Sequence, residues 1–267
     1  MKKLFISADI EGCTGTTLSE ETHKSEACYR AFADRMTEEV RAVCVAALEA
    51  GADEIVVKDG HGDATNIDIM RMPAGVRLIR GKSGHPFNMM FGLDETFDGV
   101  LYVGYHSAAG SPESPLSHTS TGNTNYVLLN GRRMSEFMLN SYTAAMLGVP
   151  VLFLSGDQGI CREAQEMIPA ITTVSTKSGC GASTINEAPE TVIQMLKEKT
   201  KEALAKDFMT CKIELPVSFD YEASYKDLKK AYRMSFYPGV EKADERTNRL
   251  HAQNYMDILV AHSFLVY

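Results

Sequence analysis

The stretch LFISADIEG, residues 4–12, decides the fold class of this 267-residue chain. It begins as a short apolar run and then carries two acids, which is the pattern of a buried strand that ends in a polar site. Five more short apolar runs follow, namely EIVV (54–57), VLYVGY (100–105), YVLL (126–129), VLFLS (151–155) and ITTVS (171–175). We interpret all six runs as buried strands.

Amphipathic segments separate these runs. Residues 31–50, 135–147 and 187–206 repeat apolar side chains at helical spacing, and glycines at 51 and 148 end the first two. Strands that alternate with helices predict an α/β fold, here with a mainly parallel central sheet flanked by helices.

The last part of the chain has a different pattern. KIELPVSF (212–219) indicates a strand, while YKDLKKAYRM (225–234) and residues 246–262 indicate helices. We therefore predict a metal-binding catalytic α/β domain over 1–206. Residues 207–267 are expected to form a smaller C-terminal α+β portion that does not fold independently and is a candidate oligomer contact.

Composition excludes several classes of protein. The 27 Lys and Arg against 35 Asp and Glu give a net charge of -8 without a basic cluster, so nucleic acid is not an expected partner. No apolar stretch is long enough to span a membrane. The six cysteines are far apart and form no zinc-knuckle spacing. We expect reduced thiols and a cytoplasmic location.

Acids and histidines follow the predicted strands. Asp9 and Glu11 come after the first strand, His61 after the second and His106 after the third, while Glu136 begins a predicted helix. The carboxyl ends of parallel strands form the ligand crevice of an open sheet. Carboxylates held close together require a cation, and this set of N and O donors suits zinc. Five ligands exceed the needs of one open site, so two metals bridged by a carboxylate fit better.

Each of these residues also has a structural interpretation. Asp9 could cap a helix or form a turn, Glu11 could be a solvated acid, and Glu136 could stabilise a helix N-terminus. His61 and His106 could be a turn histidine and a buried, hydrogen-bonded one. Their joint occurrence at strand ends favours the metal site. A serine nucleophile is not supported, because no G-x-S-x-G motif is present.

Five motifs in register resemble the D-aminopeptidase (dipeptide-transport A) family of binuclear zinc peptidases. They are SADIEG (7–12), VKDGH (57–61), GYH (104–106), LSHT (116–119) and NGRRMSE (130–136). The resemblance implies metal ligands at Asp9, Glu11, His61, His106 and Glu136, with Asp9 as the bridge. It also implies two Zn²⁺ ions per subunit and a homo-oligomer, specifically a ring-like decamer.

The resemblance further implies a catalytic nucleophile or base at His118, which lies in a long polar loop over 107–125. We expect a metal-dependent aminopeptidase that hydrolyses short peptides from the N-terminus, D-amino-acid peptides among them, with water that zinc activates. Asp59 and Asp157 are candidates for orienting the imidazoles from outside the ligand shell. The alternatives are a metal-dependent hydrolase of a phosphoester or another amide, and a non-catalytic metal- or ligand-binding protein.

Overall fold

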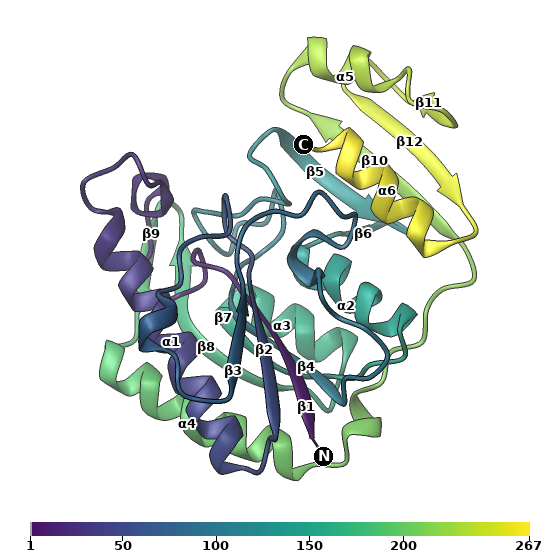
Figure 1. The fold of residues 1–267 in the computed structure, drawn as a ribbon. Helices are drawn as coiled ribbons and strands as arrows, with labels where there is room; N and C mark the ends of the chain where they lie inside the picture. The colour runs from purple at the N-terminus through teal and green to yellow at the C-terminus, as the bar shows by residue number, and fades with distance from the viewer. Residues whose placement is uncertain (1) are drawn as a thin grey trace.

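The protein is built around two β-sheets, seen in a computed structural model that describes residues 2–267 (Figure 1). The larger sheet has the strand order β3-β2-β1-β4-β7-β8-β9, and all its neighbouring strands are parallel except β8 and β9. Its strands are β1 (Lys3–Ala8), β2 (Glu54–Asp59), β3 (Val76–Ile79), β4 (Gly99–Tyr105), β7 (Val151–Asp157), β8 (Thr172–Cys180) and β9 (Ser183–Asn186). The predicted α/β class with a mainly parallel sheet is confirmed.

Helices cover both faces of this sheet. Helices α1 and α4 pack against each other on one face, and α2 and α3 lie on the other (Figure 1). The helices are α1 (Tyr29–Glu49), α2 (Glu136–Met146), α3 (Gln158–Met167), α4 (Pro189–Ala205), α5 (Leu228–Met234) and α6 (Tyr255–Leu265), with 3₁₀ turns η1 (Ser19–Thr22), η2 (Ile69–Arg71), η3 (Asn88–Met90) and η4 (Phe208–Cys211). Within the described residues, no helix has the length and apolar character that crossing a membrane requires.

The strand order fixes where a ligand can bind. From β1 the chain crosses over to β2 on one side, whereas from β4 it leads to β7 on the other side. The point where the order reverses therefore lies between the adjacent strands β1 and β4. In open α/β sheets the ligand crevice lies at this point, outside the carboxyl ends of the strands.

The smaller sheet is antiparallel and has the order β11-β12-β10-β5-β6. Its strands are β5 (Thr124–Leu129), β6 (Arg132–Arg133), β10 (Phe219–Tyr225), β11 (Val240–Lys242) and β12 (Thr247–Ala252). The predicted strand YVLL thus pairs with β10 of the C-terminal portion rather than with the parallel sheet. Helix α6 packs on this sheet and on α2, and a second apolar core lies between them (Figure 1). The division at residue 206 stays a prediction.

Three predictions for the C-terminal portion were wrong in their boundaries. The segment 212–218 is not a strand, and β10 begins only at Phe219, because Pro216 cannot donate to a β-ladder. Helix α5 begins at Leu228, after Asp227 caps it by accepting a hydrogen bond from Lys230 N. The expected helix over 246–262 is instead β12 followed by α6, and Asn254 caps α6.

The loop after β1 lies directly against β4. Gly12 N donates to Gly104 O at 2.8 Å, and a Cβ at Gly12 would be 1.8 Å from Tyr105 O, so only glycine fits. Helix α1 holds the next residues of this loop, because buried Glu39 accepts a hydrogen bond from Thr14 N at 2.9 Å. The other oxygen of Glu39 has no hydrogen-bond partner among residues 2–267. Burial raises the pKa of Glu39 to about 7.

We predict that Glu39 makes the folded state less stable as pH rises from about 4.5 to about 7. The folded state binds the proton more tightly than the unfolded chain over this range, and the shift from 4.5 is worth at most about 3 kcal/mol. Glu39→Gln keeps an acceptor for Thr14 N and removes the charge. Its free energy of unfolding should therefore exceed that of wild type above pH 7, and the difference should vanish near pH 4.5.

Urea denaturation in the presence of a chelator, repeated from pH 4.5 to pH 8, measures this difference. Glu198→Gln, at an exposed position of α4, is the matched control and should leave the pH profile unchanged. A Glu39→Gln variant whose profile stays parallel to that of wild type contradicts the prediction.

Candidate metal centre

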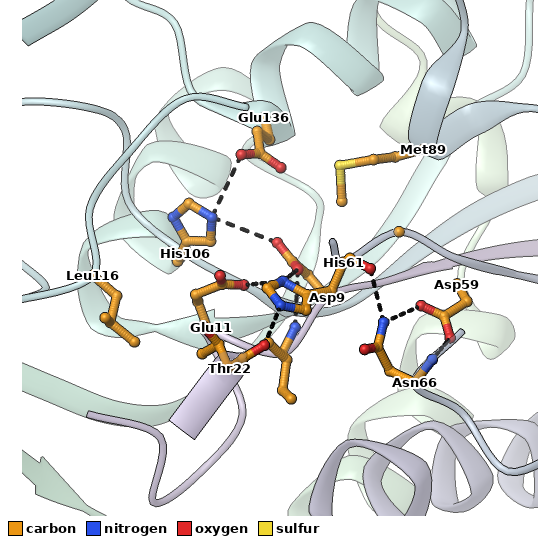
Figure 2. A network of polar contacts seen from close by, with 12 residues as sticks. Asp9, Glu11, Thr22, Asp59, His61, Asn66, Met89, His106, Leu116 and Glu136 are labelled. Carbon is orange, nitrogen blue, oxygen red and sulfur yellow. Dashed lines mark hydrogen bonds and ion pairs between the residues drawn. The ribbon is translucent and has the colours of Figure 1, made fainter. Parts of the chain in front are cut away.

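The five predicted ligands converge at the carboxyl ends of β1, β2 and β4 (Figure 2). Asp9 and Glu11 lie in the loop after β1, His61 follows β2, and His106 follows β4. Glu136 is the first residue of α2, which crosses to this edge from the smaller sheet. The side chains of Asp9, Glu11, His106 and Glu136 are nearly inaccessible to solvent, whereas that of His61 is 14% exposed.

Asp9 lies at the centre of the site, between two imidazoles. Its Oδ1 is 3.4 Å from His61 Nδ1, and its Oδ2 is 3.5 Å from His106 Nε2. Glu11 Oε2 is 3.0 Å from His61 Nδ1, while Glu136 Oε1 is 3.6 Å from His106 Nε2. The site therefore has two halves that share one carboxylate.

Main-chain carbonyls fix the orientation of both imidazoles. His61 Nε2 lies 2.9 Å from Thr22 O, and His106 Nδ1 lies 2.9 Å from Ser107 O. A carbonyl can only accept, so each of these nitrogens carries the proton and donates it. In the neutral imidazoles the opposite nitrogens, His61 Nδ1 and His106 Nε2, are the ones without a proton, and both face the carboxylates. This is the arrangement of imidazoles that bind a metal.

Burial and mutual repulsion make the carboxylate cluster unstable without positive charge. Burial, with Glu11 and Glu136 nearby, raises the pKa of Asp9 to about 7. Burial alone would lower the pKa of His106, but the Glu136 carboxylate outweighs it and raises that pKa to about 10. In the metal-free protein the histidines thus act as the cations that the acids require.

Two buried atoms of the site point to bound metal. Glu11 Oε2 and His106 Nε2 have no hydrogen-bond partner among residues 2–267. Buried polar atoms without partners are costly, and each of these atoms faces the shared space around Asp9. Carboxylate oxygens and imidazole nitrogens are donors that zinc accepts. The ligand atoms of Asp9, Glu11 and His61 all lie within 4.8 Å of one another, which fits one ion.

His118 belongs to the second half of the site. Its Nε2 is 3.6 Å from Glu136 Oε1, and its ring stacks on His106 with a centroid distance of 4.2 Å. Its Nδ1 lies 2.8 Å from Leu116 O and therefore donates to that carbonyl. The side chain is 25% exposed and lines the pocket beside the metal ligands. His106, His118 and Glu136 form a second group that could hold an ion.

Asp59 and Asp157 contact the segments that carry the imidazoles rather than the rings. Asp59 accepts hydrogen bonds from the main chain and side chain of Asn66, and Asn66 Nδ2 donates to His61 O (Figure 2). Asp157 accepts from Ser107 N and Ser107 Oγ, and its Oδ1 also caps α3 at Ile160 N. Both acids position the histidines through the main chain.

Two buried lysines support the site, and sequence reasoning did not identify their role. Lys177 Nζ donates to three carbonyls of the loop after β1, those of Glu11, Cys13 and Thr16. Lys58 Nζ donates to Asp59 O, at the end of β2, and to Gly81 O, just after β3. Lysine is seldom fully buried. A lysine within a predicted buried strand, as in VVKDG and TVSTK, is the sequence feature that could have indicated these two buried lysines.

A pocket of about 460 Å³ opens onto the metal ligands. The loops after β1 and β2 form one side of it, and the 115–122 segment forms another. Lys82, Lys226 and Tyr267 also line the pocket, so both portions of the chain contribute to it. Its size is that of a site for a small ligand.

Comparisons with known proteins agree with this geometry. A D-aminopeptidase from Bacillus subtilis (strain 168) is 34% identical over 203 residues, which cover 76% of this chain and 73% of the relative. A solved structure, described as the zinc-dependent D-aminopeptidase DppA from Bacillus subtilis, a self-compartmentalizing protease, matches with a TM-score of 0.91. It is 28% identical and the match covers 98% of this chain and 96% of that one. The model of the peptidase family M55, described as D-aminopeptidase, matches residues 1–264. The chain belongs to the D-aminopeptidase family.

Proposed function

We propose that this protein is a zinc-dependent aminopeptidase that removes the N-terminal residue of short peptides, D-amino-acid peptides among them. The observation that carries the proposal is the position of Asp9, whose two oxygens face His61 Nδ1 and His106 Nε2, the ring nitrogens that are not bonded to main-chain carbonyls. Dinuclear aminopeptidases use such a bridged pair of metals. Family membership and the zinc-dependent structural relative support a peptidase over a hydrolase of another bond.

The five ligands would hold two zinc ions, and Asp9 would be common to both groups of ligands. Asp9, Glu11 and His61 would hold one zinc ion, and Asp9, His106 and Glu136 would hold the other. When bound, the two ions supply Lewis acidity, which lowers the pKa of water and polarises the scissile carbonyl. The stoichiometry of two zinc ions per subunit is part of the proposal.

The protein's own residues bind the peptide and move protons. The acids around Asp9 would attract the free α-amino group of the substrate, which explains selectivity for an N-terminus. His118 Nε2, unprotonated and open to the pocket, would accept a proton from water and deliver it to the leaving amine. Asp59, Asp157 and Lys177 would keep the ligand-bearing loops in place.

Assembly and location extend the proposal. The structural relative is described as self-compartmentalizing, and we propose that this chain also forms a homo-oligomer, with a ring-like decamer as the expected state. The cytoplasm is the proposed location, in keeping with six free cysteines in the described part of the chain.

A substrate panel tests the proposed activity. We expect the zinc-loaded protein to hydrolyse D- or L-alanyl-p-nitroanilide and alanyl dipeptides, and a chelator to abolish this turnover. p-Nitrophenyl phosphate serves as the comparison substrate for a phosphoesterase with the same ligands. Turnover of the phosphate ester without any turnover of the aminoacyl substrates would contradict the aminopeptidase proposal.

We predict that Asp9→Ala lowers bound zinc from two equivalents to fewer than one. Loss of even an outer-shell partner costs metal sites about 10- to 100-fold in affinity, so loss of a shared ligand should cost more than about 100-fold. Metal content by mass spectrometry after dialysis, together with turnover, measures the effect. Asp257→Ala, at an exposed position on α6, is the control and should keep two equivalents. Two tightly bound zinc ions in Asp9→Ala would rule out the bridging role.

We predict that His118→Gln lowers kcat by about 10²- to 10⁴-fold, the usual contribution of general acid–base catalysis, while zinc stays at two equivalents. His251→Gln, on the exposed face of β12, should keep wild-type turnover. The assignment of His118 as a base fails if the variant turns over normally. It also fails if the variant loses one zinc ion, because His118 would then be a ligand.

A further inference from the structure

Tyr267 brings the C-terminal portion of the chain into the substrate pocket. It follows α6 and lines the pocket together with Ser120 and the metal ligands. Lys230 of α5 fixes this segment, because its Nζ donates to Val266 O at 2.6 Å and to Tyr267 O at 2.9 Å. None of the roles assigned above uses the Tyr267 hydroxyl.

Asn88 supplies the first hydrogen bond to the Tyr267 hydroxyl. Lys82 Nζ donates to Asn88 Oδ1 at 2.9 Å and to Gly60 O, which fixes the orientation of the Asn88 amide. Asn88 Nδ2 therefore faces Tyr267 and donates to its phenol oxygen. Asn88 has a φ of +46°, in the left-handed region that asparagine tolerates better than most residues.

Ser120 lines the same pocket as Tyr267, and the core of the smaller sheet fixes the orientation of its hydroxyl. The buried Tyr221 hydroxyl lies 2.9 Å from His262 Nδ1 and must use its proton there. His262 Nδ1 is then an acceptor, so Nε2 carries the ring proton and donates to Ser120 Oγ at 2.8 Å. The Ser120 hydroxyl is thereby free to donate onward into the pocket, which Ser120 and Tyr267 both line.

The hydrogen bond from Asn88 leaves the proton of Tyr267 without an acceptor among residues 2–267. Because the Asn88 Nδ2 group can only donate, the phenol O–H must point toward another acceptor. Although Tyr267 is 48% exposed overall, partial desolvation raises the pKa of its phenol above the usual value, so the hydroxyl stays protonated. The open direction is the pocket that contains Asp9, Glu11 and Glu136.

We propose that Tyr267 is a substrate-binding residue that donates a hydrogen bond to an oxygen of the bound peptide, either a main-chain carbonyl or the terminal carboxylate. This inference rests on the proposed function and names a further contact within the same pocket. It gives residues 207–267 a direct part in substrate recognition, because Tyr221, Lys230, His262 and Tyr267 all lie in that portion.

The test begins with Tyr267→Phe, which removes the hydroxyl and keeps the ring. We expect KM for alanyl dipeptides to rise about 3- to 10-fold if the acceptor is a carbonyl, or about 10- to 100-fold if it is a carboxylate. The kcat should stay within about twofold, since binding is lost equally in the ground and transition states. Zinc content and melting temperature should stay at wild-type values. Tyr232→Phe, on the exposed face of α5, is the control.

Asn88→Asp tests the direction of the hydrogen bond while the hydroxyl remains. The new carboxylate oxygen replaces the Nδ2 donor with an acceptor. The Tyr267 O–H would then donate to this carboxylate and no longer point into the pocket. We expect the same rise in KM as in Tyr267→Phe and no further rise in the double variant. A KM unchanged in Asn88→Asp would overturn the proposed proton direction.

Matched substrates identify the acceptor. If the carboxylate is bound, Tyr267→Phe should affect D-alanyl-D-alanine strongly and its C-terminal amide little; if a carbonyl is bound, both should be affected equally. An active wild type with an unaffected Tyr267→Phe variant overturns this inference and leaves the aminopeptidase proposal standing. A wild type that neither binds the dipeptide in calorimetry nor hydrolyses it overturns both.

Discussion

The structure depends on the attraction between three buried carboxylates and the positive charge that must lie between them. Asp9, Glu11 and Glu136 are almost fully removed from water, and carboxylates in such surroundings are stable only when a cation compensates them. Without metal, the imidazoles of His61 and His106 supply the positive charge that compensates the carboxylates. The charge balance explains why each imidazole gives one nitrogen to a main-chain carbonyl and leaves the other for the acids.

The scaffold meets this constraint with main-chain contacts rather than with further charged pairs. Lys177 binds carbonyls of the loop after β1, and Lys58 binds one carbonyl at the end of β2 and one just after β3. Each ammonium group satisfies backbone oxygens that would otherwise be buried without partners. Asp59 and Asp157 do the converse and accept from backbone N–H groups. The ligands are thus held by the loops' own backbone, which leaves their side chains free for metal.

Much of the fold and the ligand set could be predicted from the sequence because both follow from local patterns. The short apolar runs predicted β1, β2, β4, β7 and β8. The polar residues that follow these runs lie where the parallel strands end. The assignment of β5 to a separate sheet could not be predicted, because its partner β10 is distant in sequence. An apolar run predicts a strand but does not indicate which other strand it pairs with. His118 required the family resemblance, because nothing in a polar loop indicates which metal ligand it will approach. The hydrogen bonds of Lys177 and Tyr267 depend on tertiary contacts that no local pattern encodes.

The pairing of Leu129 with Tyr221 has a consequence for biosynthesis. The strand β5 lies between His118 and Glu136 in the chain, and its partner β10 leaves the ribosome only after β7, β8 and α4 have been made. The parallel sheet, with Asp9, Glu11, His61 and His106, can form earlier, whereas the half of the site with Glu136 and His118 gains its supporting sheet only after β10 has been synthesised.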